Sequence, residues 1–167
     1  MIGSGYLNTL FVVIFGTFLS LILTSLGAYF LSRRDVMLKN LIMGLITFTM
    51  FFSGGLIPFY LTVKMLGMYD SLLALVIPTA ISTYNLIIMR TSFMSIPRSL
   101  EEAAIIDGAG HFRILTNVVL PLSKAIIAVM ILYYGVAAWN GWFYAMVFLA
   151  DRAKFPLQLV LREILIQ

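Results

Sequence analysis

Cysteine is absent from the 167 residues, which excludes disulfides, thiolate metal sites and thiol catalysis. Charge is also scarce: 11% of the residues are Asp, Glu, Lys or Arg, against about 25% in soluble domains. Lys and Arg never cluster beyond two adjacent residues, so nucleic-acid binding is not expected. The single histidine, His111, has no second histidine to share a metal, and a solvated loop residue is the simpler reading.

Apolar residues make up 62% of the chain, and the mean hydropathy is +1.04. A chain this short has no soluble core large enough to hide that surface, so part of its solvent must be lipid. A helix needs about 20 apolar residues to cross a bilayer. The sequence therefore predicts an all-α membrane protein with four transmembrane helices, at about residues 6–32, 40–63, 71–90 and 121–150. No strand-like alternation favours a barrel.

The basic residues are unevenly distributed over the connections. Seven of the eleven lie in the first and third connections: Arg33, Arg34, Lys39, Arg90, Arg98, Arg113 and Lys124. The positive-inside rule places these two connections in the cytoplasm and both chain ends outside. An outside N-terminus without a signal peptide predicts a fragment of a longer membrane protein, with at least one preceding span.

Glycine and proline interrupt two of the predicted spans. Gly54, Gly55 and Pro58 lie in the second span, and Pro78 lies early in the third. Membrane helices tolerate both residues, and a hinge or a bend lining a cavity is the functional alternative.

The third connection forms a compact polar stretch over residues 96–125. Ser99 and Glu102 have the spacing of a capping box, which predicts a helix over residues 100–107. Gly108 is placed to end it in the left-handed conformation, and Gly110 permits a second bend. Residues 111–118 are expected to form another short helix before Pro121 leads into the fourth span.

Over residues 96–121, which are expected to form a cytoplasmic loop, this stretch resembles the EAA motif of type I ABC-transporter permeases. The matching positions, read as EEAAIIDGAG and VVLPLSKA, are Glu102, Ala103, Ala104, Gly108, Val118, Leu120 and Pro121. The fuller pattern is similar to the sugar-uptake branch, including maltose-type and complex-oligosaccharide permeases. The resemblance implies a type I importer permease bundle, of which this chain holds four spans and lacks the first and last.

The resemblance also implies partners and a coupling site. In such permeases this loop is a coupling helix docked in a cleft of the ATP-hydrolysing subunit, and the corresponding residues here are Glu102, Ala103, Ala104, Asp107 and Gly108. Glu102 matches the position that pairs with a basic residue of that subunit, although it is also placed to cap its own helix. The implied partners are two ATP-binding cassette subunits, a second permease, an extracytoplasmic solute-binding protein and the bilayer. This chain is expected to bind no cofactor, with ATP and Mg²⁺ held by the partner.

The fourth predicted span carries a candidate substrate path. Sugars present CH faces that stack on aromatic rings and hydroxyls that need amide or phenol partners, which favours Tyr133, Trp139, Asn140 and Trp142. Asn85 in the third span is a weaker candidate. An interfacial aromatic belt and interhelical hydrogen bonds are the alternative explanations.

These observations predict the membrane subunit of a bacterial ABC importer in the cytoplasmic membrane, moving a carbohydrate and most simply an oligosaccharide. It is expected to be a transporter subunit and not an enzyme, because no span carries paired carboxylates or a nucleophile with its base. An importer for a non-sugar solute, and a channel or scaffold without ATP coupling, remain as alternatives.

Overall fold

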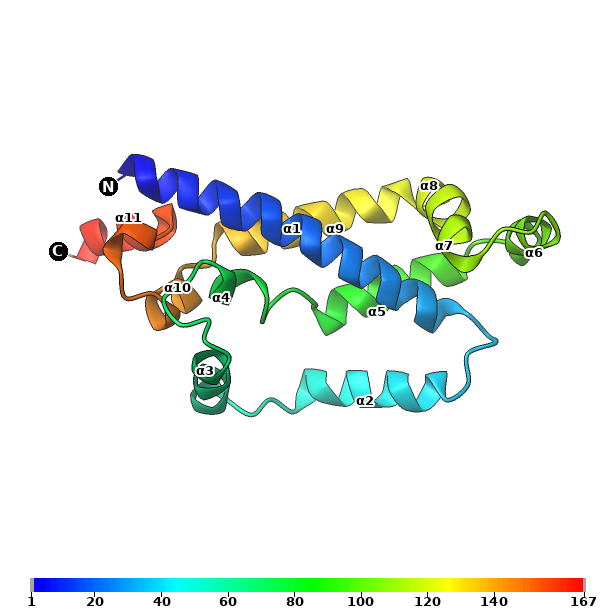
Figure 1. Ribbon diagram of the computed structural model, residues 1–167, viewed down its shortest axis with the longest axis horizontal. Coiled ribbons are helices and arrows are strands. Elements are labelled where there is room, and N and C mark those ends of the chain that lie inside the picture. Colours follow the sequence, from blue (N-terminus) through cyan, green and yellow to red (C-terminus); the bar gives the residue numbers. More distant parts are fainter. Residues whose placement is uncertain (1, 167) are drawn as a thin grey trace. The chain divides into compact units, whose positions relative to one another are not determined.

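The computed structural model describes residues 2–166, and these residues form helices and no strand (Figure 1). The elements are α1 (Ile2–Ser32), α2 (Lys39–Phe51), α3 (Leu56–Met65), α4 (Leu73–Val76), α5 (Thr83–Met94), α6 (Arg98–Ile106), α7 (His111–Ile114), the π-helical turn η1 (Leu115–Val119), α8 (Leu120–Leu122), α9 (Lys124–Trp139), α10 (Trp142–Phe148), the 3₁₀ turn η2 (Arg152–Lys154) and α11 (Leu157–Ile166). The all-α prediction is confirmed for this part of the chain.

The described residues fall into two compact units. Unit 1 consists of residues 2–20, 52–81 and 132–166, and unit 2 consists of residues 21–51 and 82–131. Helices α1 and α9 each contribute to both units. The polar stretch after α5 belongs to unit 2, and the tryptophans belong to unit 1.

Helix α1 has the polarity expected in lipid. Its buried side chains include hydroxyls, among them Thr9, Thr24 and Ser25, whereas large apolar side chains such as Leu7 and Ile14 are about two-thirds exposed. A polar face turned toward protein and an apolar face turned outward is the arrangement of a membrane helix. Among residues 2–166, α1 is the one helix that is long and apolar enough by itself to cross a bilayer.

The other three predicted spans are interrupted in the structure. The second is divided at residues 52–55, where Gly55 has a φ of +86°, and the third at residues 77–82, which contain Pro78. The fourth is divided between α9 and α10. If the α2–α3 pair and the run from α7 to α9 each count as one bent span, the number of candidate spans rises from one to three. Glycine and proline explain the first two breaks, because neither sustains the helical hydrogen-bond ladder well.

The core of unit 1 forms around α10. Phe148 is fully buried and packs with Val63 and Ala74. Ala145 and Leu149 pack against Leu159 of α11. Just after the end of α3, Gly67 has a φ of +71°, and the N–H groups of Gly67 and Met68 donate to carbonyls of the last turn of that helix.

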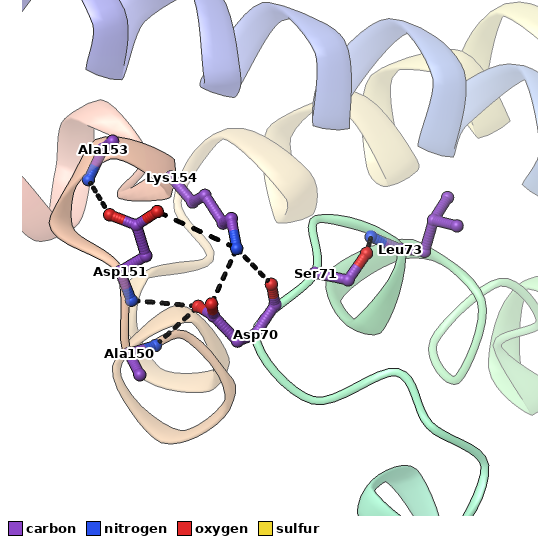
Figure 2. Close-up of polar contacts among 7 residues, drawn as sticks. All are labelled: Asp70, Ser71, Leu73, Ala150, Asp151, Ala153 and Lys154. Carbon is purple, nitrogen blue, oxygen red and sulfur yellow. Dashed lines mark hydrogen bonds and ion pairs between the residues drawn. The ribbon is translucent and has the colours of Figure 1, made fainter.

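A polar network around Asp70 fixes the segment that follows α10 (Figure 2). The Asp70 carboxylate accepts hydrogen bonds from the N–H groups of Ala150 and Asp151, each at 2.9 Å, and from the Lys154 ammonium at 2.6 Å. The Asp151 N–H, followed by Lys154, lowers the pKa of Asp70 to about 2. Thr9 of α1 holds the next residues, because its hydroxyl accepts the Leu157 N–H at 2.8 Å.

Unit 2 packs α5 closely against the second half of α1. A Cβ at Gly27 would lie 3.1 Å from Leu86 Cδ1, so glycine permits this approach. Arg90 donates from Nε to the Leu31 carbonyl at 2.9 Å, which satisfies a carbonyl that the end of α1 leaves free. The end of α1 is thereby attached to the helix that leads into the polar stretch.

Candidate functional site

Helix α6 begins at Arg98, after Pro97. Pro97 is the N-cap residue, with φ −58° and ψ 130°, and no side chain makes a capping hydrogen bond. The predicted capping box is therefore wrong, because Ser99 already has a place inside the first turn, whereas a capping hydroxyl must come from the non-helical residue before it. The Leu100 N–H instead donates to the Pro97 carbonyl at 3.2 Å.

Helix α6 ends as the sequence predicts. Gly108 has a φ of +77°, its N–H donates to the Ile105 carbonyl, and the Ala109 N–H donates to the Ala104 carbonyl, both at 2.9 Å. This pair of bonds is a Schellman motif, which ends the helix at its C-cap residue, Asp107, and satisfies two of its last carbonyls. The result is a short helix with a defined end.

No residue of α6 is buried. Glu102, Ala103 and Asp107 are exposed, and Ala104 is half-buried. Large apolar side chains are exposed on the same module: Leu100, Ile105, Ile106 and, just beyond it, Phe112. Figure 1 shows that the chain extends away from α5, forms α6 at the tip of this excursion, and then returns to α7. A polar helix that also exposes apolar side chains has the composition of a protein-binding surface.

A cavity of about 280 Å³ opens beside α6 within unit 2. It has an apolar part that includes Phe93 and Ile105 and a rim of both charges: Arg33, Arg34, Asp35, Arg98, Glu101 and Glu102. The Glu102 carboxylate makes no hydrogen bond or ion pair with any residue from 2 to 166. Glu102 is therefore available to a cation from another molecule.

Arg33 connects the end of α1 to the module. Its Nε and Nη2 donate to the two carboxylate oxygens of Asp35, each at 2.9 Å, and its Nη1 lies 2.9 Å from both Tyr29 Oη and His111 Nδ1. The bonds between Arg33 and Asp35 raise the pKa of the guanidinium and lower the pKa of the Asp35 carboxyl. Because arginine only donates, Nδ1 of His111 accepts this bond. His111 is therefore a contact residue of Arg33.

Changing Arg33 to Gln is expected to loosen α7 in the full-length protein. The variant loses the bond to His111, so protection of the Ile114 amide, which donates to Gly110, should fall roughly twofold to tenfold. Hydrogen exchange measured by mass spectrometry checks this. Arg34→Gln is the matched control, because Arg34 lines the same cavity but makes no side-chain bond with the described residues. Equal loss of protection in both variants would contradict the role of Arg33.

The predicted second helix over residues 111–118 is more complex in the structure. Residues 111–114 are α-helical, residues 115–119 form a π-helical turn, and α8 carries Pro121. Proline has no N–H to donate into the preceding turn, which accounts for a wider turn before it. The run from α7 to α8 meets α9 at an angle of 87°.

Three of the predicted path residues lie together around the break between α9 and α10 in unit 1. Trp139 packs edge-on against Tyr6, with ring centroids 6.3 Å apart. The Asn140 side-chain amide donates to the Val136 carbonyl at 3.0 Å, a carbonyl that also accepts the Asn140 backbone N–H. Trp142 is 36% exposed and lies under the Arg162 guanidinium. Tyr133 is exposed on α9, and Asn85 is buried in unit 2. Their contact with a substrate stays a prediction.

A second cavity, of about 210 Å³, lies within unit 1. Its lining combines the rings of Tyr134 and Tyr144 with the hydroxyls of Ser20 and Thr79. Thr17, one turn away on α1, has a buried hydroxyl without a hydrogen-bond partner among the described residues. These groups come from three separate parts of the chain. The residue pattern within any one predicted span therefore did not indicate that they line a common cavity.

The chain matches, over residues 16–163, the family described as "Binding-protein-dependent transport system inner membrane component". It belongs to that family. Among curated relatives, it is 48% identical over 166 residues to the "Polygalacturonan/rhamnogalacturonan transport system permease protein YtcP" of Bacillus subtilis (strain 168), covering 99% of this chain and 58% of the relative. It is 45% identical over 158 residues to "Protein LplC" of the same organism, covering 95% of this chain and 54% of the relative.

A solved structure is also similar. The "Crystal structure of a bacterial ABC transporter involved in the import of the acidic polysaccharide alginate" contains a chain 41% identical to this one, with a TM-score of 0.94 over 96% of this chain and 57% of that chain. The chain thus spans a little over half the length of the proteins it matches. The resemblance to type I ABC permeases of the sugar-uptake branch, and the fold class that it implied, are confirmed.

Proposed function

We propose that the full-length protein is the membrane-spanning subunit of a bacterial ABC importer that carries an oligosaccharide across the cytoplasmic membrane. Family membership supports the transport role, and the sugar-related names of the relatives support the substrate class. ATP and Mg²⁺ would bind on the partner ATPase subunits and not on this chain.

The observation that carries the coupling role is the state of α6. None of its residues is buried, its C-terminus is closed by Gly108, and the Glu102 carboxylate has no partner among residues 2–166. A short helix with a closed end transmits a rigid-body movement that a flexible loop would absorb. We assign Glu102, Ala103, Ala104, Asp107 and Gly108 to the contact with the ATPase.

The proposed assembly follows the family pattern. Two ATP-binding cassette subunits would dock from the cytoplasm, a second permease would complete the path, and an extracytoplasmic solute-binding protein would deliver the sugar. The basic first and third connections favour a cytoplasmic position for α6 by the positive-inside rule. The same rule favours an extracytoplasmic position for the second connection and for the residues after the fourth span.

The substrate class is drawn from the relatives' printed names. One is a polygalacturonan and rhamnogalacturonan permease, and the similar crystal structure is of a transporter for the acidic polysaccharide alginate. Galacturonan chains carry a carboxylate on each sugar. We therefore propose an acidic, uronate-containing oligosaccharide as the imported solute.

The test is reconstitution of the full-length permease with its partner permease, ATPase subunits and binding protein in proteoliposomes. ATP-dependent accumulation of labelled oligogalacturonate of two to four sugars is the expected result. A neutral oligosaccharide of equal length is the comparison. Accumulation of neither sugar, or uptake that does not need ATP, would overturn the proposed function.

A further inference from the structure

We propose that Arg162, held against Trp142, binds a carboxylate of the acidic oligosaccharide at the extracytoplasmic end of the path. This inference rests on the proposed function and adds a specificity-determining residue to it. The Arg162 guanidinium carbon lies 4.3 Å from the centroid of the Trp142 ring. Both residues belong to unit 1, with Trp142 at the start of α10 and Arg162 on α11.

The charges of unit 1 leave Arg162 without a carboxylate. Arg152 pairs with Glu163 at 2.8 Å, and Lys154 pairs with Asp70 at 2.6 Å. No carboxylate among the described residues lies within 4.0 Å of Arg162. Within residues 2–166, the guanidinium makes a single hydrogen bond, from Nη1 to the sulfur of Met146 at 3.0 Å, and sulfur is a weak acceptor.

Arg162 also differs from Lys64, the other cation of unit 1 without an ion pair. Lys64 is an exposed side chain with no ring beneath it among the described residues, whereas Arg162 is half-buried and oriented by Trp142. A guanidinium that is already held in place loses less conformational freedom when it binds a ligand. Arg162 is therefore better preorganised than Lys64 to bind an anion.

The geometry suits a uronate. A guanidinium is a planar fork of donors that matches a carboxylate with two parallel hydrogen bonds, and Nε and Nη2 of Arg162 have no partner among residues 2–166. Trp142 is 36% exposed, so part of the indole beside the guanidinium is accessible to a CH group of the same sugar. The charged contact with Arg162 would distinguish a uronate from a neutral hexose.

The experiment measures binding of a galacturonate trisaccharide, and of the same trisaccharide with its carboxyls reduced to alcohols, to the full-length transporter complex. The complex is held in phosphatidylcholine nanodiscs without the binding protein, so that selectivity of the binding protein does not enter. Arg162→Gln should weaken the acidic sugar roughly tenfold or more and leave the neutral sugar unchanged, because one charge-assisted contact is removed. Arg162→Lys should fall between wild type and Gln, since it keeps the charge but loses the fork.

Arg152→Gln is the matched control, an arginine that is already paired with Glu163 and should show no selective effect. Parallel loss of both sugars in Arg162→Gln would show a packing role between α10 and α11 and overturn the inference. So would unchanged affinity for the acidic sugar, or an effect that appears only when phosphatidylglycerol is added, which would identify a lipid headgroup site. A wild-type transporter that binds and imports only neutral sugars would overturn this inference while leaving sugar import intact.

Discussion

Changing Glu102 to Lys in the full-length transporter is expected to weaken association with the ATPase subunit by at least about 30-fold. Glu102 is exposed on α6 and has no partner among residues 2–166. If it pairs with a basic residue of the ATPase, as the family resemblance implies, the reversed charge faces that residue instead. Losing one partner of a hydrogen-bonded charge pair buried in an interface costs about 2–5 kcal/mol, and 1.4 kcal/mol corresponds to tenfold in affinity.

Titration of purified ATPase subunit against the permease in nanodiscs gives the affinity, and ATP-driven uptake gives the functional consequence. Glu102→Gln should have a smaller effect, because it keeps the side-chain length and removes only the charge. Glu163→Lys is the control for a charge reversal elsewhere, since Glu163 lies in unit 1 and pairs with Arg152. Wild-type affinity in Glu102→Lys would remove the basis for assigning the coupling site.

The sequence predicted the end of α6 better than its start. The motif depends on residues close together in the chain, and so does the end of α6, where only glycine takes a φ of +77° without strain. The capping box failed for a local reason: Pro97 is the N-cap residue, which places Ser99 two positions too late to cap.

Longer-range features gave no usable sequence signal. Arg33 and His111 are 78 residues apart. Nothing in the sequence around either residue distinguishes it from an ordinary polar loop residue. Asp70, which has a φ of +57°, accepts hydrogen bonds from N–H groups 80 and 81 positions further along the chain. The sequence indicated where the helices of two spans are interrupted, at Gly54, Gly55 and Pro78. The lengths of these breaks depend on packing within each unit. The boundaries of the four spans stay a prediction.

Changing Gly108 to Val is expected to disable coupling while leaving α6 itself in place. A left-handed backbone costs an ordinary L-residue roughly 1–2 kcal/mol, and a β-branched residue more. No atom lies within 4 Å of a Cβ built at Gly108, so the penalty comes from the backbone alone. The Ala109 amide, which donates to Ala104 in the closing turn, should lose protection from hydrogen exchange by at least about 5-fold to 30-fold.

Uptake should fall together with the protection of the Ala109 amide. Without the closing hydrogen bonds, the end of α6 would deform when the ATPase moves, and the movement would not reach the spans. Gly110→Ala is the matched control: this glycine lies two residues on, has a φ of −74° and has equally open surroundings, so both protection and uptake should match wild type. Gly108→Asn should lie between them, since asparagine tolerates the left-handed region. Reduced Ala109 protection with normal uptake would show that the closed end is dispensable, and the rigid-helix account of coupling would then have to be abandoned even if Glu102 still binds the ATPase.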